Sequence, residues 1–244
     1  MKWADEGIVI AITPFSEDQA RLSLHTRTSG RQSGLFRLSK RQPTLQLGDF
    51  VSATWNARLS EHLGRFQIER LESFAPRMFY DAWRLWLLQN ACGLMATLPD
   101  RHPYPVIFEE LLSFIKELTT SADHMAFMRM TLFEKEILAE LGFGIDLSEC
   151  CVTQERCNLA FISPKTGRAV SAEAAAPYVD KLLPLPAFWL KKDPSKENPA
   201  WTEVSNAFHV NHYFWQKWLF NDKQTFPSVR ASIIEYCQKK KNLS

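Results

Sequence analysis

Residues 127–170 read FMRMTLFEKEILAELGFGIDLSECCVTQERCNLAFISPKTGRAV, and the rest of the chain can be placed around this stretch. Its first part carries apolar residues at steps of three and four, which predicts an amphipathic helix; they are Phe127, Met130, Phe133, Ile137, Leu138 and Leu141. Gly142 stands where a helix end favours a left-handed residue, and Phe143 follows as the apolar contact of that cap. A cysteine cluster, a strand-like run at 159–163 and a Pro-Lys-Thr-Gly turn come next. This order is typical of a joint between two bodies.

Length and composition limit the class of protein. A chain of 244 residues with 45% hydrophobic content is long enough for one large or two modest domains with a real core. No run approaches the roughly 18 continuous apolar residues of a membrane helix, and the acidic start MKWADEGIVI is unlike a signal peptide. The five cysteines are odd in number and unevenly spread, unlike a disulfide framework. We therefore expect a cytoplasmic protein with no membrane partner.

The first 75 residues predict β-structure. Residues 8–12 form a strand with two apolar faces, and side chains alternate in the period of a strand over 20–25, 34–38, 51–57 and 66–68, with turn signals at 28–30 and 47–49. Five short strands in this length are typical of a small closed barrel, either an OB-fold or an SH3-like barrel.

One basic segment lies within this β-region. No acidic residue occurs between Asp18 and Asp49, whereas six basic residues do: Arg21, Arg27, Arg31, Arg37, Lys40 and Arg41. The alternation places several of them on one strand face, and two interpretations stay open: the basic residues bind phosphates, or they solvate a barrel surface. Phe36 either stacks on a base or faces the barrel core. Lys165 and Arg168, in the later Gly-containing turn, are candidates for a second contact.

Pro76 marks the predicted domain boundary, because helical periodicity begins beyond it. We expect a barrel domain at 1–75 and a helical domain at 76–244, with a cysteine-containing turn element inserted at about 146–172. Helices are predicted over 78–98, 105–118 and the opening stretch, from Ser171 as N-cap to about Leu182, over 201–218, and from Pro227 onward. The fold class is therefore α+β and multidomain.

Four segments then point to a family. They are GIVIAITPFSED (7–18), LGDFVSATWNARLSEHLG (47–64), FEKEILAELGFGIDLSECCVT (133–153) and AFISPKTGRAVS (160–171), and together they resemble the recombination mediator protein O (RecO) family. The resemblance covers nearly the whole chain. It implies an N-terminal OB-fold, a helical domain, binding of single- and double-stranded DNA, and annealing of complementary strands. It also implies action with protein R (RecR) to load recombinase onto DNA coated by single-strand binding protein.

The family resemblance also raises the question of zinc. Some members carry a four-cysteine zinc module that begins C-x-x-C; here Cys150 matches the first ligand, but Thr153 stands at its partner position. No cysteine occurs near 170–174, where the second pair is expected, and Cys157 has the wrong spacing. Because structural zinc needs four ligands, we predict no metal and no cofactor, and we interpret the cysteines as buried or spare thiols.

Two further sets of residues could suggest a catalytic or metal site, but each lacks the partners that such a site needs. Glu134 falls inside the apolar helical stripe, where a carboxylate is usually paired with a buried Arg or a backbone donor. His209 and His212 are three residues apart but lack an acidic or cysteine partner nearby in the sequence. No phosphate-binding loop or catalytic triad accompanies them. We therefore predict a protein that is not an enzyme and has no small-molecule substrate.

Three hypotheses remain open. The first is a DNA-repair and recombination mediator that binds DNA in a nucleoid-associated, bacterial setting. The alternative is a protein-interaction scaffold whose barrel and Trp-rich helices dock partners without direct DNA binding; the tryptophans are Trp83, Trp86, Trp201, Trp215 and Trp218. The third is a hydrolase, for which no set of residues can be named. The resemblance further implies that the helical domain binds the C-terminal tail of single-strand binding protein.

Overall fold

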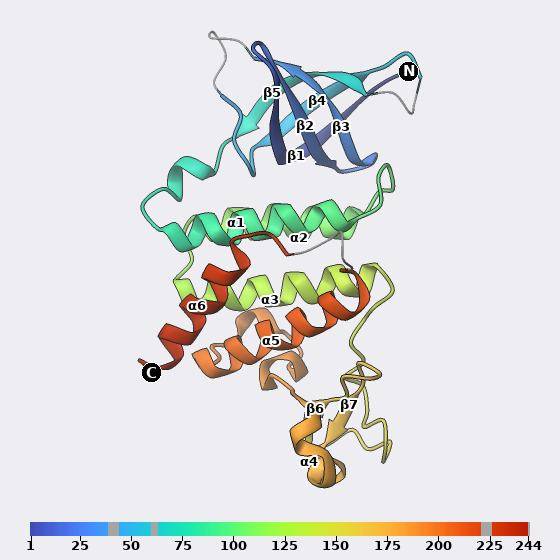
Figure 1. The fold of residues 1–244 in the computed structure, drawn as a ribbon, viewed down its shortest axis with the longest axis vertical. Helices are drawn as coiled ribbons and strands as arrows, with labels where there is room; N and C mark the ends of the chain where they lie inside the picture. The colour runs from blue at the N-terminus through green and yellow to red at the C-terminus, as the bar shows by residue number, and fades with distance from the viewer. Residues whose placement is uncertain (39–43, 60–62, 221–225, 244) are drawn as a thin grey trace. The chain divides into compact units, whose positions relative to one another are not determined.

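The computed structural model describes residues 1–38, 44–59, 63–220 and 226–243, which form two compact units, Met1–Ser121 and Ala122–Ser244 (Figure 1). Each unit has its own secondary structure and core. In the described residues, no helix combines the length and the apolar character needed to cross a membrane.

The first unit begins with a closed five-stranded barrel. Its strands are β1 (Lys2–Ser16), β2 (Gln19–Thr26), β3 (Gly30–Arg37), β4 (Phe50–Asn56) and β5 (Gly64–Glu72), in the order β1-β2-β3-β5-β4. The long β1 closes the barrel, because its first half pairs with β4 and its second half with β2, with a bulge between Val9 and Ala11. Bulges increase strand twist and bend, which is what closure of so small a sheet requires.

The period-two alternation of these strands fills the barrel. Residues that alternate inward form one core cluster, namely Val9, Leu22, Leu24, Phe36, Leu45, Val51, Ala53, Trp55 and Phe66. The predicted fold class, an OB-fold barrel followed by helices, is confirmed, and strand closure through β1 favours the OB-fold over the SH3-like alternative.

Two helices belong to the same compact unit as the barrel. Helix α1 (Ala82–Leu94) lies between the short turns η1 (Ala75–Arg77) and η2 (Met95–Thr97), and α2 (Pro105–Leu118) follows. Pro105 occupies the first turn of α2, where its missing N–H costs nothing. The Cys92 thiol of α1 lies 3.9 Å from the Val9 carbonyl oxygen of β1. Helices α1 and α2 are thus grouped with the barrel, and a domain boundary near Pro76 stays a prediction.

The second unit is built on three helices, α3 (Asp123–Glu140), α5 (Trp201–Trp218) and α6 (Arg230–Lys241). Helix α3 ends as the sequence predicts: Gly142 has a φ of +84°, and the Phe143 N–H donates to the Leu138 carbonyl at 2.8 Å. Phe127 of α3 stacks on Tyr236 of α6 at 5.0 Å between ring centroids. The last helix begins at Arg230, three residues beyond the expected Pro227.

A small sheet is formed by the chain between α3 and α5. Its order is β7 (Ala169–Ser171), β6 (Leu159–Ile162) and β8 (Leu183–Pro184), so the strand-like run at 159–163 is confirmed. Ser171 caps a helix by accepting the Ala174 N–H, but α4 (Ala172–Ala175) is a single turn that continues as η3 (Ala176–Lys181). The further turns η4 (Ala187–Leu190) and η5 (Pro194–Lys196) lead to α5.

Candidate nucleic-acid interface

The β2–β3 hairpin carries four of the six residues of the predicted basic segment. Its register pairs Gln19 with Arg37, Arg21 with Leu35 and His25 with Arg31, while Arg27 follows β2 in the turn. Two ends of the hairpin can therefore be distinguished. The open end holds Arg21 and Arg37, and the turn end holds Arg27 and Arg31.

Arginines at the open end face solvent. Arg21 is exposed and forms no ion pair with any residue in the described part of the chain. The side chain of Arg37 is 83% exposed, and its Nε lies 3.5 Å from Oδ2 of Asp18. An exposed ion pair of this kind contributes little to stability, so another anion can readily replace Asp18 as the partner of Arg37. Both guanidinium groups are available to a phosphate.

At the turn end, Arg27 is held inside its own unit. It forms ion pairs with Glu6 of β1, at 3.0 Å, and with Glu109 of α2. Its guanidinium carbon also lies 4.5 Å above the ring of Phe108. The charge of Arg27 is therefore paired with carboxylates of the same unit, and the flat face of its guanidinium packs on an aromatic ring. Arg27 connects the hairpin to α2 and is not a free cation.

Arg31 is held in a similar way. Its Nε lies 3.0 Å from Oδ1 of Asp100, without the alignment of a hydrogen bond, and the Arg101 N–H donates to its carbonyl oxygen. Beside it, His25 is fully buried, and burial lowers the pKa of its imidazole to about 4, against a weaker opposing effect of the Tyr104 backbone. The charge of Arg31 lowers this pKa further. The turn end is therefore a packed contact that requires a neutral His25.

Three predicted residues need a different account. Phe36 is only 9% exposed and belongs to the barrel core, so its ring cannot stack on a base while the barrel is folded; the core alternative is the correct one. Successive side chains of a strand point to opposite faces, so Phe36 faces inward because Arg37 faces outward. Lys40 and Arg41 lie outside the described residues.

Lys165 and Arg168 belong to the second unit, in the turn between β6 and β7. Arg168 pairs with Asp146 and with Glu149, each at 3.3 Å, which joins the two sides of the cysteine-containing element. Gly167 has a φ of +72°, and a Cβ there would lie 2.8 Å from the Trp218 ring, so the turn packs closely on the end of α5. Lys165 is exposed.

The strand register also reveals two exposed cations that sequence reasoning missed. They are Lys2 of β1 and Arg65 of β5. In the strand register, Leu35 lies between Arg21 and Arg65 and pairs with both. Asn56 lies between Arg65 and Lys2 and pairs with both. Neither lies in the acid-free segment, so composition alone does not mark them. Only knowledge of which strands pair, and in which register, could have found them.

The cysteine-containing element does not fit zinc. Cys150 Sγ accepts hydrogen bonds from the N–H groups of Thr153, at 3.5 Å, and Ser171, at 3.3 Å. Thr153 stands at the position expected for the second zinc ligand, and Ser171 lies within 170–174, where the second pair of cysteines was expected. Burial alone would raise the pKa of the Cys150 thiol, but hydrogen bonding by the side chains and backbone N–H groups of Thr153 and Ser171 lowers it to about 6. Across the described ranges, no three His, Cys, Asp or Glu side chains gather as metal ligands.

Glu134 has the buried arginine partner that its position predicts. It is fully buried and forms an ion pair with Arg230 of α6, with a second contact of 3.1 Å between Oε2 and Nη2. Asn211 of α5 also donates to Oε2 at 3.1 Å, and the rings of Phe208 and Phe226 lie 4.8 and 4.6 Å from the Arg230 guanidinium carbon. This ion pair joins three helices and is structural.

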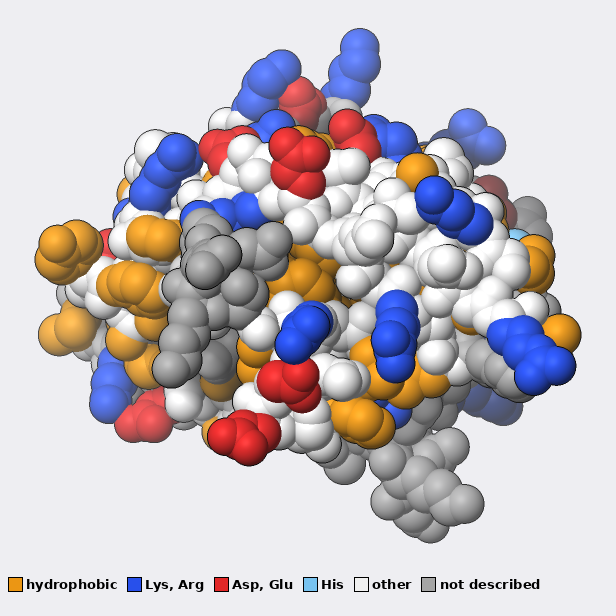
Figure 2. All heavy atoms as spheres, turned by 90° about the horizontal axis from the view of Figure 1, so that it is seen from above, with side chains coloured by type: hydrophobic (Ala, Val, Ile, Leu, Met, Phe, Trp, Pro, Cys, Tyr) orange, Lys and Arg blue, Asp and Glu red, His pale blue; other side chains and the backbone are white. Residues whose placement is uncertain are grey.

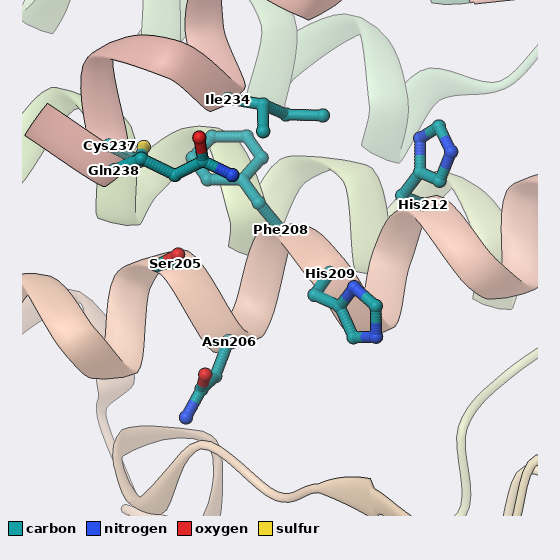
Figure 3. A pocket seen from close by; sticks show the side chains of 8 residues that line it. All are labelled: Ser205, Asn206, Phe208, His209, His212, Ile234, Cys237 and Gln238. Atoms are coloured by element: carbon teal, nitrogen blue, oxygen red, sulfur yellow. The ribbon is translucent and has the colours of Figure 1, made fainter.

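A cavity of about 200 Å³ opens between α5 and α6, lined by Ser205, Asn206, Phe208, His209, His212, Ile234, Cys237 and Gln238. Figure 3 shows that the rings of His209 and His212 point away from one another, and that Cys237 lies apart from both. The His212 ring stacks on Phe226 at 4.6 Å, and burial lowers its pKa. The pair therefore does not form a metal site.

Comparison with known proteins adds an independent finding. Two family profiles match this chain: "Recombination protein O N terminal" over residues 1–74 and "Recombination protein O C terminal" over residues 80–206. DNA repair protein RecO of Chelativorans sp. (strain BNC1) is 40% identical over 238 residues, which cover 96% of this chain and 94% of that protein. The proteins of the same name from Mesorhizobium japonicum and Brucella abortus (strain 2308) are 39% and 36% identical, covering 98% and 100% of this chain and 94% and 99% of those proteins.

Proposed function

Because the chain belongs to the recombination protein O family, whose members act in DNA repair and recombination, we propose that it is a DNA-binding mediator rather than an enzyme. In this proposal the barrel binds single- and double-stranded DNA without sequence preference. The protein anneals complementary strands and, together with protein R (RecR), loads recombinase onto DNA coated by single-strand binding protein. It acts in the cytoplasm, in association with the nucleoid.

The observation that carries the proposal is the exposed open end of the β2–β3 hairpin. Arg21 and Arg37 are outward-facing guanidinium groups on neighbouring strands, and neither is held by α2 or the segment before it, as Arg27 and Arg31 are. Phosphate contacts made by such groups supply affinity that is independent of sequence and depends strongly on salt.

Filter binding of single-stranded DNA over a salt series tests this proposal. The double variant Arg21→Ala and Arg37→Ala should bind strands of any sequence more weakly, and its plot of log K against log salt should flatten by about 0.7 for each phosphate that is no longer bound. Arg77→Ala removes one exposed arginine, paired with Glu72 outside the hairpin, and serves as the control for the loss of a surface charge elsewhere, against Arg21→Ala and Arg37→Ala tested singly. A wild-type protein that shows no salt-dependent DNA binding would favour the interaction scaffold instead.

A second part of the proposal concerns the helical region. The family resemblance implies that it binds the acidic, phenylalanine-ended C-terminal tail of single-strand binding protein, through an apolar pocket for the ring and a nearby cation for the carboxylate. Calorimetry with the full chain and a tail peptide tests this part. Equal binding of a peptide that lacks the terminal phenylalanine would contradict it.

A further inference from the structure

Outward-facing residues of the barrel form rows that cross its strands. One row is defined by successive register partners: Thr13 with Arg21, Arg21 with Leu35, Leu35 with Arg65, Arg65 with Asn56, and Asn56 with Lys2. We call Lys2, Arg21 and Arg65 the cation row. All three side chains are exposed, and within the described parts of the chain none of them forms an ion pair.

A second row on the same barrel carries acidic residues. Ser52 of β4 pairs with Glu6 on one side and with Glu69 on the other. Glu6 and Glu69 lie four residues along their strands from Lys2 and Arg65, which corresponds to about 13 Å at the usual strand rise. Along the sequence these charges read as a mixture, but the register separates them into a cation row and an acid row.

On the side toward the acid row, the residues beside the cation row are uncharged hydrogen-bonding groups. Ser23 and Ser33 lie next to it on β2 and β3, with their hydroxyl oxygens 3.0 Å apart, and Thr54 pairs with Gln67 on β4 and β5. Hydroxyl and amide groups are frequent partners of phosphate and sugar oxygens. On the face shown in Figure 2, Lys and Arg side chains are interspersed with acidic, apolar and other groups and do not form one continuous basic patch.

We propose that the backbone of single-stranded DNA crosses the barrel strands along the cation row, from Lys2 over Arg65 to Arg21, instead of following the β2–β3 hairpin alone. Successive cations stand two strands apart, about 10 Å. Glu6 of the acid row is already paired with Arg27, and Glu69 is the member that repels a backbone that strays toward the turn end. Contacts of this type read phosphates and not bases, so the path has no sequence preference. This inference rests on the proposed DNA binding and adds Lys2 and Arg65 to the residues that perform it.

The test compares substitutions within and outside the row in the full-length protein, by filter binding of a homopolymeric single strand over a salt series. Lys2→Gln with Arg65→Gln should weaken binding several-fold at low salt and flatten the salt dependence by about 1.4, that is, 0.7 for each of two phosphates. Glu69→Gln should bind as tightly as wild type or more tightly, because it removes repulsion. Arg77→Gln should leave affinity and slope unchanged.

The outcomes separate this inference from the proposed function. If Lys2→Gln with Arg65→Gln retains wild-type affinity and slope while Arg21→Gln weakens binding, the crossing path is wrong and DNA binding by the hairpin stands. If the wild-type protein does not bind DNA, both proposals fail together. The substituted side chains are all exposed, and unchanged thermal unfolding of each variant verifies that weaker binding does not come from a disturbed fold.

Discussion

Both ends of the β2–β3 hairpin carry arginines, but those at the turn end are paired within the protein and those at the open end face solvent. At the turn end, Arg27 and Arg31 meet carboxylates and a ring supplied by α2 and the segment before it. At the open end, Arg21 has no ion-pair partner among the described residues, and Arg37 meets only Asp18, at 3.5 Å with both side chains more than half exposed. The difference teaches that a basic segment becomes a binding surface only where no distant part of the chain has already neutralised it.

Arg230 in the second unit is the arginine that the protein encloses most completely. It is 3% exposed and lies between Glu134 and two aromatic rings, so the protein supplies its whole environment. Removing one partner of such a pair leaves the other as an uncompensated buried charge, whereas replacing both with apolar residues avoids that cost.

The largest effect is therefore expected from Glu134→Gln or Arg230→Met, each of which should lower the free energy of unfolding by about 3–5 kcal/mol. Urea unfolding followed by far-ultraviolet circular dichroism measures it. The double variant Glu134→Leu with Arg230→Met should recover much of this stability. A single variant as stable as wild type would show that the pair does not hold the three helices.

The next effect concerns pH at the turn end. Because the pKa of folded His25 is about 4 and that of an unfolded histidine about 6.5, the unfolded chain binds the proton first. Stability contributed by neutral His25 should be present above pH 6.5 and lost as the pH falls toward 4, by about 3 kcal/mol in total. Urea unfolding at pH 7, 6 and 5 tests this, since carboxylates are largely ionised there.

His25→Asn is the comparison variant for that series. The variant should be less stable than wild type at pH 7. Between pH 6.5 and 5, its free energy of unfolding should fall less with pH than that of wild type, and the two slopes should differ by up to about 1.4 kcal/mol per pH unit. Identical pH dependence in both proteins would mean that His25 does not carry the acid sensitivity of the turn end.

A smaller pair of effects separates the two ends directly. Arg27→Ala should cost about 1 kcal/mol of stability, because partly exposed ion pairs and a cation–π contact contribute little each, and it should leave the salt dependence of DNA binding unchanged. Arg21→Ala should do the reverse. Unfolding midpoints and salt series on the same two variants measure both properties, and a flattened salt slope in Arg27→Ala would contradict the division between held and free arginines.

Local features were predictable from the sequence, and features set by distant partners were not. Helix α2 runs from Pro105 to Leu118 as expected, because proline chemistry and apolar periodicity act within one element. Arg27 could not be recognised as held, because Glu109 is far along the chain. Lys2 and Arg65 were missed for the same reason, since pairing between β1, β4 and β5 decides that they share a row with Arg21.

The cysteine-containing element extends the comparison to thiols, with the smallest expected effect. Cys150 accepts hydrogen bonds from two backbone N–H groups and packs with Val170 and Ala175, so the thiol that matches the first ligand of a four-cysteine module is held by hydrogen bonds and apolar contacts within the protein. We expect no stoichiometric zinc by elemental analysis and no change of the unfolding midpoint on adding a chelator. One zinc per chain, absent from Cys150→Ser, would show instead that Cys151 or Cys157 completes a metal site.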